Sequence, residues 1–173
     1  MSLLSLARGF PGHPSHPPMT DAAIGSYTAA TVLACLSVAG VAEDALAKGW
    51  WIVLLVGLGF GALAAVTGLA DWLTISRGTP LWRTATTHMI VMLTATLLFA
   101  LAAIVGYGGY DDGETGVAEL VLALCAFAAL TLGGWIGGSI VFVHGMRVLE
   151  LPEEPAGRAM APGGEEKARA ASG

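Results

Sequence analysis

Six residues of this chain have side chains that could bind a metal or move a proton: His13, His16, Asp21, Asp71, His88 and His144. Neutral imidazole binds both haem iron and first-row metals, and a carboxylate adds an oxygen donor that suits divalent ions. The sequence contains neither a nucleophile–base pair nor a phosphate-binding glycine loop. An enzyme with a substrate of its own is therefore not the expected function.

The elements that position these residues are apolar enough to cross a membrane. The chain is 55% hydrophobic and 12% charged, whereas soluble domains are about 45–50% apolar and about a quarter charged. Four apolar stretches reach the ~20 residues that a ~30 Å hydrocarbon core requires: about 20–42, 50–73, 81–105 and 117–144. Because the connections are short, we predict an all-α, up-down four-helix bundle embedded in the membrane.

Two other segments flank the predicted bundle, which covers residues 20–147. Residues 1–19 form a segment rich in proline and histidine, which we place at the membrane face. Its prolines predict an extended backbone over residues 12–18, with His13 and His16 about 9 Å apart along the axis. Residues 148–173 are rich in Pro, Gly, Ala and charge, which predicts a disordered tail.

Basic residues are distributed unequally between the two ends of the predicted bundle. The terminal side holds seven, and the other side has only Lys48; the seven are Arg8, Arg77, Arg83, Arg147, Arg158, Lys167 and Arg169. This bias predicts that both termini are cytoplasmic in a multi-pass protein of the inner membrane. All four histidines then lie at the cytoplasmic side. No basic stripe could follow a phosphate backbone, so nucleic acid is not an expected partner.

His88 is the histidine predicted to lie deepest in the membrane. At 1.5 Å rise per residue it lies roughly 8–10 Å inside the third span. Ionisable groups at such depth usually face the bundle interior and mark a functional site. A structural hydrogen bond to another helix is the alternative explanation.

Pairs of glycines predict where helices pack closely. Gly57 and Gly61 are four residues apart in the second span, as are Gly133 and Gly137 in the fourth. This spacing leaves a flat groove that accepts a neighbouring helix, either of the same chain or of a second copy in a homo-oligomer.

Several motifs resemble one known family. Residues 12–25, GHPSHPPMTDAAIG, resemble the HPxHPxxxDxPIG opening of the bacterial four-span membrane proteins called domain of unknown function 2231. Residues 67–72, TGLADW, and His88 match further elements of that family, and the likeness extends over roughly residues 9–147. The family's membrane module is similar to one fused to Rieske iron–sulfur domains, which implies redox work. Two positions depart from the pattern: Ala23 replaces a proline, and Ser139 replaces a histidine of the last helix.

Three hypotheses follow from these residues. The first is a redox-linked module that binds haem b through His88 and one of His13, His16 or His144, together with a membrane redox partner. The second is a metal or proton site built from His13, His16, Asp71 and His88. The third is a non-catalytic scaffold or subunit, in which polar residues only lock the helices together.

Overall fold

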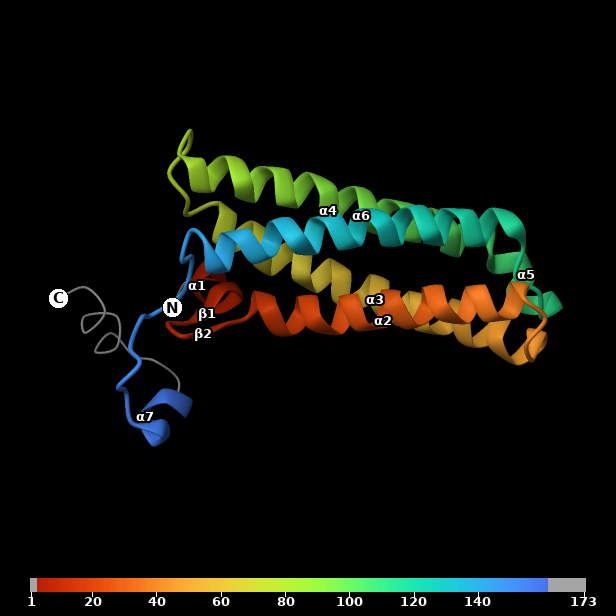
Figure 1. The fold of residues 1–173 in the computed structure, drawn as a ribbon, viewed down its shortest axis with the longest axis horizontal. Coiled ribbons are helices and arrows are strands. Elements are labelled where there is room, and N and C mark those ends of the chain that lie inside the picture. The colour runs from red at the N-terminus through yellow and green to blue at the C-terminus, as the bar shows by residue number, and fades with distance from the viewer. Residues whose placement is uncertain (1–2, 162–173) are drawn as a thin grey trace.

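The computed structural model describes residues 3–161, and within this range the chain is almost entirely helical (Figure 1). Four long helices make up the body: α2 (His16–Val38), α3 (Glu43–Trp72), α4 (Pro80–Val105) and α6 (Val117–Phe142). The predicted all-α four-helix bundle is confirmed.

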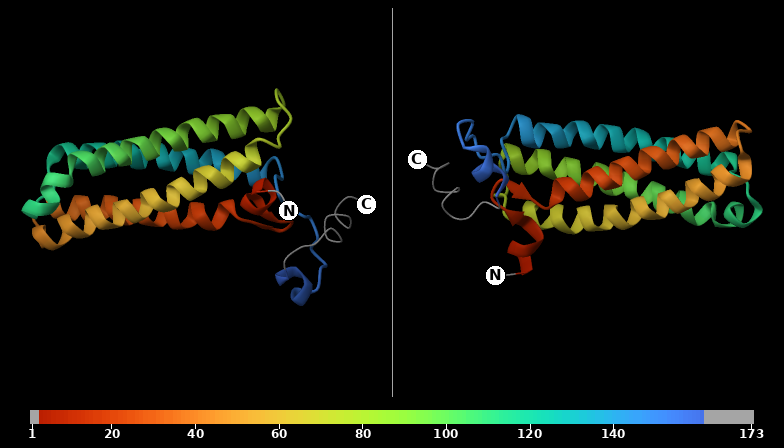
Figure 2. Two further views of the ribbon diagram at one scale, coloured as in Figure 1. Left: turned by 180° about the vertical axis from the view of Figure 1, so that it is seen from behind. Right: turned by 90° about the horizontal axis from the view of Figure 1, so that it is seen from below.

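The bundle consists of two helical hairpins that lie side by side. Contacts are dense between α2 and α3 and between α4 and α6, and far sparser between the two hairpins. The views in Figures 1 and 2 agree that both described chain ends and the α3–α4 connection lie at one end of the bundle. We call this the basic end, because it contains Arg8, Arg77, Arg83 and Arg147.

The outer surface of the four long helices suits lipid. Each helix is long and apolar enough to span a membrane. In α3 only 17% of the most apolar stretch is buried inside the protein, so most of its aliphatic side chains face outward, including Val66, which is 61% exposed. In water such a surface would be unfavourable, whereas hydrocarbon covers it without cost.

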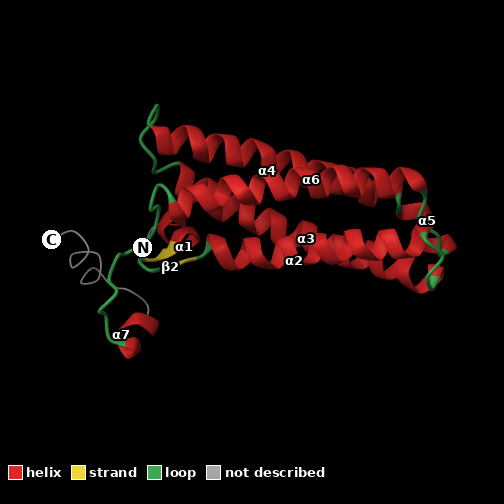
Figure 3. Cartoon of the chain, in the orientation of Figure 1, coloured by secondary structure: helices red, strands yellow, loops and turns green. Residues whose placement is uncertain are grey.

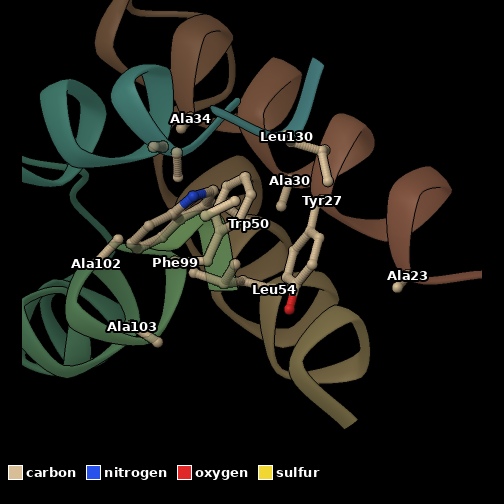
Figure 4. Packing of buried hydrophobic residues seen from close by; sticks show 13 residues of the cluster. Ala23, Tyr27, Ala30, Ala34, Trp50, Leu54, Phe99, Ala102, Ala103 and Leu130 are labelled. Carbon is tan, nitrogen blue, oxygen red and sulfur yellow. The ribbon is translucent and has the colours of Figure 1, made fainter. Parts of the chain in front are cut away.

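The interior between the hairpins is packed with aromatic rings and alanines (Figure 4). The rings of Tyr27 in α2 and Phe99 in α4 stack with centroids 4.2 Å apart and planes 7° apart. Trp50 in α3 is also fully buried, at 1% exposure. The Tyr27–Phe99 stack joins one hairpin to the other near the middle of the bundle.

The glycine grooves predicted from the sequence are occupied by the chain's own side chains. A Cβ at Gly57 would lie 2.8 Å from Tyr27 Cδ1, and Gly61 faces the same tyrosine. Gly133 faces Met92 and Gly137 faces His88, both from α4. These four glycines therefore allow helices of one chain to approach each other, and they leave no free groove there for a second copy.

Two of the helices begin before the predicted boundaries. α2 starts at His16, with Pro17 and Pro18 in its first turn, so residues 16–18 are helical instead of extended as predicted. Proline is tolerated there because the first amides of a helix have no intrahelical partner. α3 starts at Glu43, since its polar first turn continues the helix beyond the apolar stretch. Acidic residues such as Glu43 are favourable at a helix N-terminus.

Short elements complete the two ends of the bundle (Figure 3). The helix α1 (Leu3–Arg8) and the paired strands β1 (Gly9–Phe10) and β2 (His13–Pro14) precede α2. At the opposite end, α5 (Tyr107–Asp112) links α4 to α6. The tail predicted to be disordered, residues 148–173, contains a short helix, α7 (Ala156–Met160), and its residues 162–173 lie outside the described range.

Gly106 is a position where a small substitution should have a large effect. A Cβ at this residue would overlap the outer ring of the buried Trp50 side chain. Because a rigid aromatic side chain in a packed interior has little room to move, we expect Gly106→Ala to destabilise the protein by about 1–3 kcal/mol. Thermal unfolding in detergent measures this change.

The matched control for this prediction is Gly108→Ala. A Cβ added at Gly108 would meet no other group within 4 Å, so the same added methyl should leave the unfolding midpoint nearly unchanged. Equal midpoints for both variants would show that the Trp50 contact does not restrict Gly106.

Candidate functional site

His16 is held between the first turn of α2 and the last turns of α3. Its Nδ1 lies 2.9 Å from the carbonyl oxygen of Ala64 and 3.2 Å from Thr67 Oγ1. The ring packs directly on Gly68, where a Cβ would lie 2.8 Å from His16 Cε1. The glycine thus provides the space that the imidazole occupies.

His88 has a matching environment in the other hairpin. Its Nδ1 lies 2.8 Å from the carbonyl oxygen of Gly133 in α6. Its ring packs on Gly137, where a Cβ would lie 2.9 Å from His88 Cε1. In both hairpins, therefore, the histidine bonds the carbonyl four residues before the glycine on which its ring rests.

The hydrogen bonds fix the same tautomer for both rings. A carbonyl oxygen can only accept, so Nδ1 carries the proton in each neutral imidazole and donates it. In His16 the Nε2 atom has only a long 3.4 Å contact with Thr20 Oγ1, and that hydroxyl donates instead to the His16 carbonyl at 2.9 Å. His88 Nε2 has no hydrogen bond to the described part of the chain. Each Nε2 thus keeps a lone pair for a ligand.

The two imidazoles belong to different hairpins but lie in one region. His16 is the first residue of α2, His88 lies in the third turn of α4, and both side chains are half-buried. Each hairpin thus contributes one imidazole, held by a backbone carbonyl of the same hairpin.

The other two histidines have different surroundings. His13 is exposed in β2. His144 follows α6, and its Nε2 lies 3.0 Å from Thr84 Oγ1 of α4. Because the Thr84 hydroxyl donates to the Pro80 carbonyl, it accepts from His144. Ser139, where the family pattern has histidine, donates to Trp135 of its own helix at 3.4 Å.

Asp71 takes part in an ionic network. The residue is 6% exposed, and its carboxylate accepts from Arg8 Nε at 2.9 Å, with Arg147 Nε at 3.8 Å. Arg147 Nη2 also donates to the backbone carbonyl of Arg8 at 2.6 Å. The network connects the N-terminal segment, the end of α3 and the segment after α6.

The four residues expected to form a metal site do not gather into one group. Between residues 3 and 161, no cluster of three or more His, Cys, Asp or Glu side chains is placed to hold a metal ion. His13 is exposed and Asp71 pairs with arginines, whereas His16 and His88 each bond a backbone carbonyl of their own hairpin.

Sequence reasoning missed the residues that hold these side chains. It did not identify Gly68 and Ala64 as the environment of His16, nor Arg8 and Arg147 as partners of Asp71. The spacing of Ala64 and Gly68 is the same small-residue spacing as Gly133 and Gly137, so this signal was present in the sequence.

These features define a class: a multi-pass helical membrane protein with two half-buried imidazoles in equivalent surroundings. The family model described as "Predicted membrane protein (DUF2231)" matches residues 12–150, and the chain belongs to this family. No curated protein and no solved structure matches the chain.

Proposed function

We propose that this protein is a redox-linked membrane module in which His16 and His88 would together hold one haem b. The observation that carries the proposal is that both rings donate Nδ1–H to a backbone carbonyl and keep Nε2 unprotonated. Histidines that bind metal almost always use this arrangement, because the donated bond fixes the ring and makes the other nitrogen more basic.

The number of available ligands favours haem over a bare metal ion. A structural metal site requires about four protein donors, and the part of the chain that the structure describes offers no such group. A porphyrin supplies four nitrogens itself, so two imidazoles complete the coordination of its iron. When bound, haem supplies reversible one-electron exchange.

The interface between the hairpins is where we place such a group. His16 belongs to the α2–α3 hairpin and His88 to the α4–α6 hairpin, and the two hairpins contact each other only sparsely. The hydrogen bonds of both rings run within their own hairpin. The bonds that orient the two ligands therefore do not cross the interface between the hairpins.

The proposed site lies toward the cytoplasm of a bacterial inner membrane. The basic end carries Arg8, Arg77, Arg83 and Arg147, and arginine is enriched on the cytoplasmic side of membrane proteins. A redox partner that exchanges electrons with this end would then be cytoplasmic or would reach the same membrane face.

A scaffold without a cofactor is the second candidate function. The observation that favours it is that His16 and His88 each already join two helices by a hydrogen bond. In a scaffold these bonds would be the whole purpose of the histidines, and Nε2 would bind nothing.

Haem titration of the purified protein separates the two candidates. The proposal predicts saturable binding of one haem per chain, with a sharpened and shifted Soret band and reversible reduction by dithionite. A scaffold predicts only weak, non-saturable partition of haem into the detergent micelle, as in a protein-free control.

A further inference from the structure

A second feature of the basic end is a pocket of about 400 Å³ that lies apart from the two imidazoles. This volume is within the range of about 300–1,000 Å³ that is typical of small-molecule sites. Arg8 and Arg147 line it together with Ser76, while Ile75, Leu81 and Met146 supply apolar walls.

The charges around this pocket do not balance. Its two arginines share one carboxylate, Asp71, which hydrogen-bonds to Arg8 and lies 3.8 Å from Arg147 Nε. Arg147 Nε is buried and has no hydrogen-bond partner among the described residues. A net positive charge with an unused donor favours an anion.

Arg147 has an unfavourable backbone conformation, which indicates that other contacts hold the residue in place. Its φ is 66°, in the left-handed region that residues other than glycine rarely adopt. Its guanidinium donates to the carbonyls of Arg8 and Phe10, which fixes it beside the pocket. A planar guanidinium in a fixed position is well suited to bind two oxygens of a phosphate.

The location and the apolar walls point to a lipid as the source of that phosphate. The pocket lies where the chain leaves α3, enters α4 and leaves α6. Nearby, the rings of Trp72 and Trp82 lie 6.0 Å apart, and tryptophan is enriched at the level of the headgroups. Basic pockets between helix ends on this side of a membrane bind anionic headgroups.

We propose that this pocket binds the phosphate of an anionic phospholipid, with Arg147 and Arg8 as the binding cations. The apolar side chains of Ile75, Leu81 and Met146 then contact the glycerol backbone and the first acyl carbons. The site is separate from the haem proposal, and neither depends on the other.

Lipid retention tests the proposal directly. The full chain is reconstituted in nanodiscs of phosphatidylglycerol and phosphatidylcholine, extracted in mild detergent and examined by native mass spectrometry. We expect one retained phosphatidylglycerol per chain, and Arg147→Gln should lower this retention about fivefold or more. Arg83→Gln is the matched control, because Arg83 is an exposed arginine of the same end outside the pocket.

A second variant controls for misfolding of Arg147→Gln. Ser76 lines the pocket, and its hydroxyl makes no hydrogen bond within residues 3–161, so Ser76→Leu fills the space and leaves the ion pairs intact. It should also lower retention while the helix content measured by circular dichroism stays unchanged. Equal retention by wild type, Arg147→Gln and Ser76→Leu would overturn the proposal.

A titration with inorganic phosphate distinguishes the two sources of the anion. The proposal predicts no saturable binding of free phosphate to the detergent-solubilised chain, because the apolar walls contribute to lipid binding only. Saturable phosphate binding combined with equal retention of both phospholipids would overturn the assignment to lipid.

Discussion

Replacing either His16 or His88 with alanine is expected to weaken haem binding by about 100-fold or more. Loss of residues that merely orient a ligand already costs about 10–100-fold in metal affinity, and these variants would remove one of the two imidazoles proposed to hold the iron. Among the described histidines, only His16 and His88 have a ring that rests on a glycine and an Nδ1 that bonds to a backbone carbonyl. Titration with haem, followed at the Soret band, measures the change.

The remaining two histidines are matched controls for this prediction. His13 is exposed, and His144 uses Nε2 in its bond with Thr84, so His13→Ala and His144→Ala should bind haem as the wild type does. A loss of binding in His144→Ala equal to that in His88→Ala would instead favour ligation between the third and fourth spans.

Asp71→Ala is expected to destabilise the protein by about 1–3 kcal/mol. Removing the carboxylate leaves the part-buried guanidinium groups of Arg8 and Arg147 facing each other without a counter-charge. An uncompensated charge in a part-buried position costs more than the ion pair itself contributes. The N-terminal segment should detach as well, because Arg8 is its main polar link to α3. Thermal unfolding and limited proteolysis near residues 3–15 measure the two effects.

Asp21→Ala is the control for this second prediction. Asp21 is the other aspartate near the basic end, but it is exposed near the start of α2. Its removal should change stability by less than about 0.5 kcal/mol, as is usual for surface positions. Similar midpoints for the two alanine variants would contradict the role assigned to the Arg8–Asp71–Arg147 network.

The spans could be predicted because membrane insertion depends on a property visible in sequence. Twenty or so consecutive apolar residues are required whatever the tertiary contacts are, and all four spans were found in order. The ends were less predictable, since a helix continues into polar residues that hydropathy does not count. α3 therefore begins at Glu43 rather than near Trp50.

Side-chain partners could not be predicted in the same way. Trp50 stands at the edge of an apolar stretch, where an aromatic residue would ordinarily face the headgroups. It is buried instead, because Gly106 from α4's end leaves room for its ring. Such a contact depends on two residues that are distant in sequence, and no local pattern records it.

The candidate site could be predicted from the sequence in part. His88 was identified from its depth alone, since an ionisable group inside a span requires a partner. His16 was one of several candidates because its prolines suggested an extended segment. The structure places it in the first turn of α2, where its ring reaches Gly68 and Ala64 of α3.

The two histidines have equivalent surroundings, and this equivalence is the main support for haem binding by both. One histidine bonded to a carbonyl is an ordinary helix–helix contact in a membrane protein. Here both hairpins repeat the same contact, with the glycine four residues after the bonded carbonyl in each. A site that requires two identical ligands from opposite sides explains this repetition, whereas helix locking alone does not require it.

Electron paramagnetic resonance of the ferric haem complex tests this claim most directly. Two imidazole ligands make ferric haem low-spin, so the wild-type protein should give a low-spin spectrum. His16→Ala and His88→Ala should each give a high-spin spectrum, while His13→Ala and His144→Ala keep the low-spin one. A low-spin spectrum retained in both His16→Ala and His88→Ala would contradict the assignment of these two residues as the ligands.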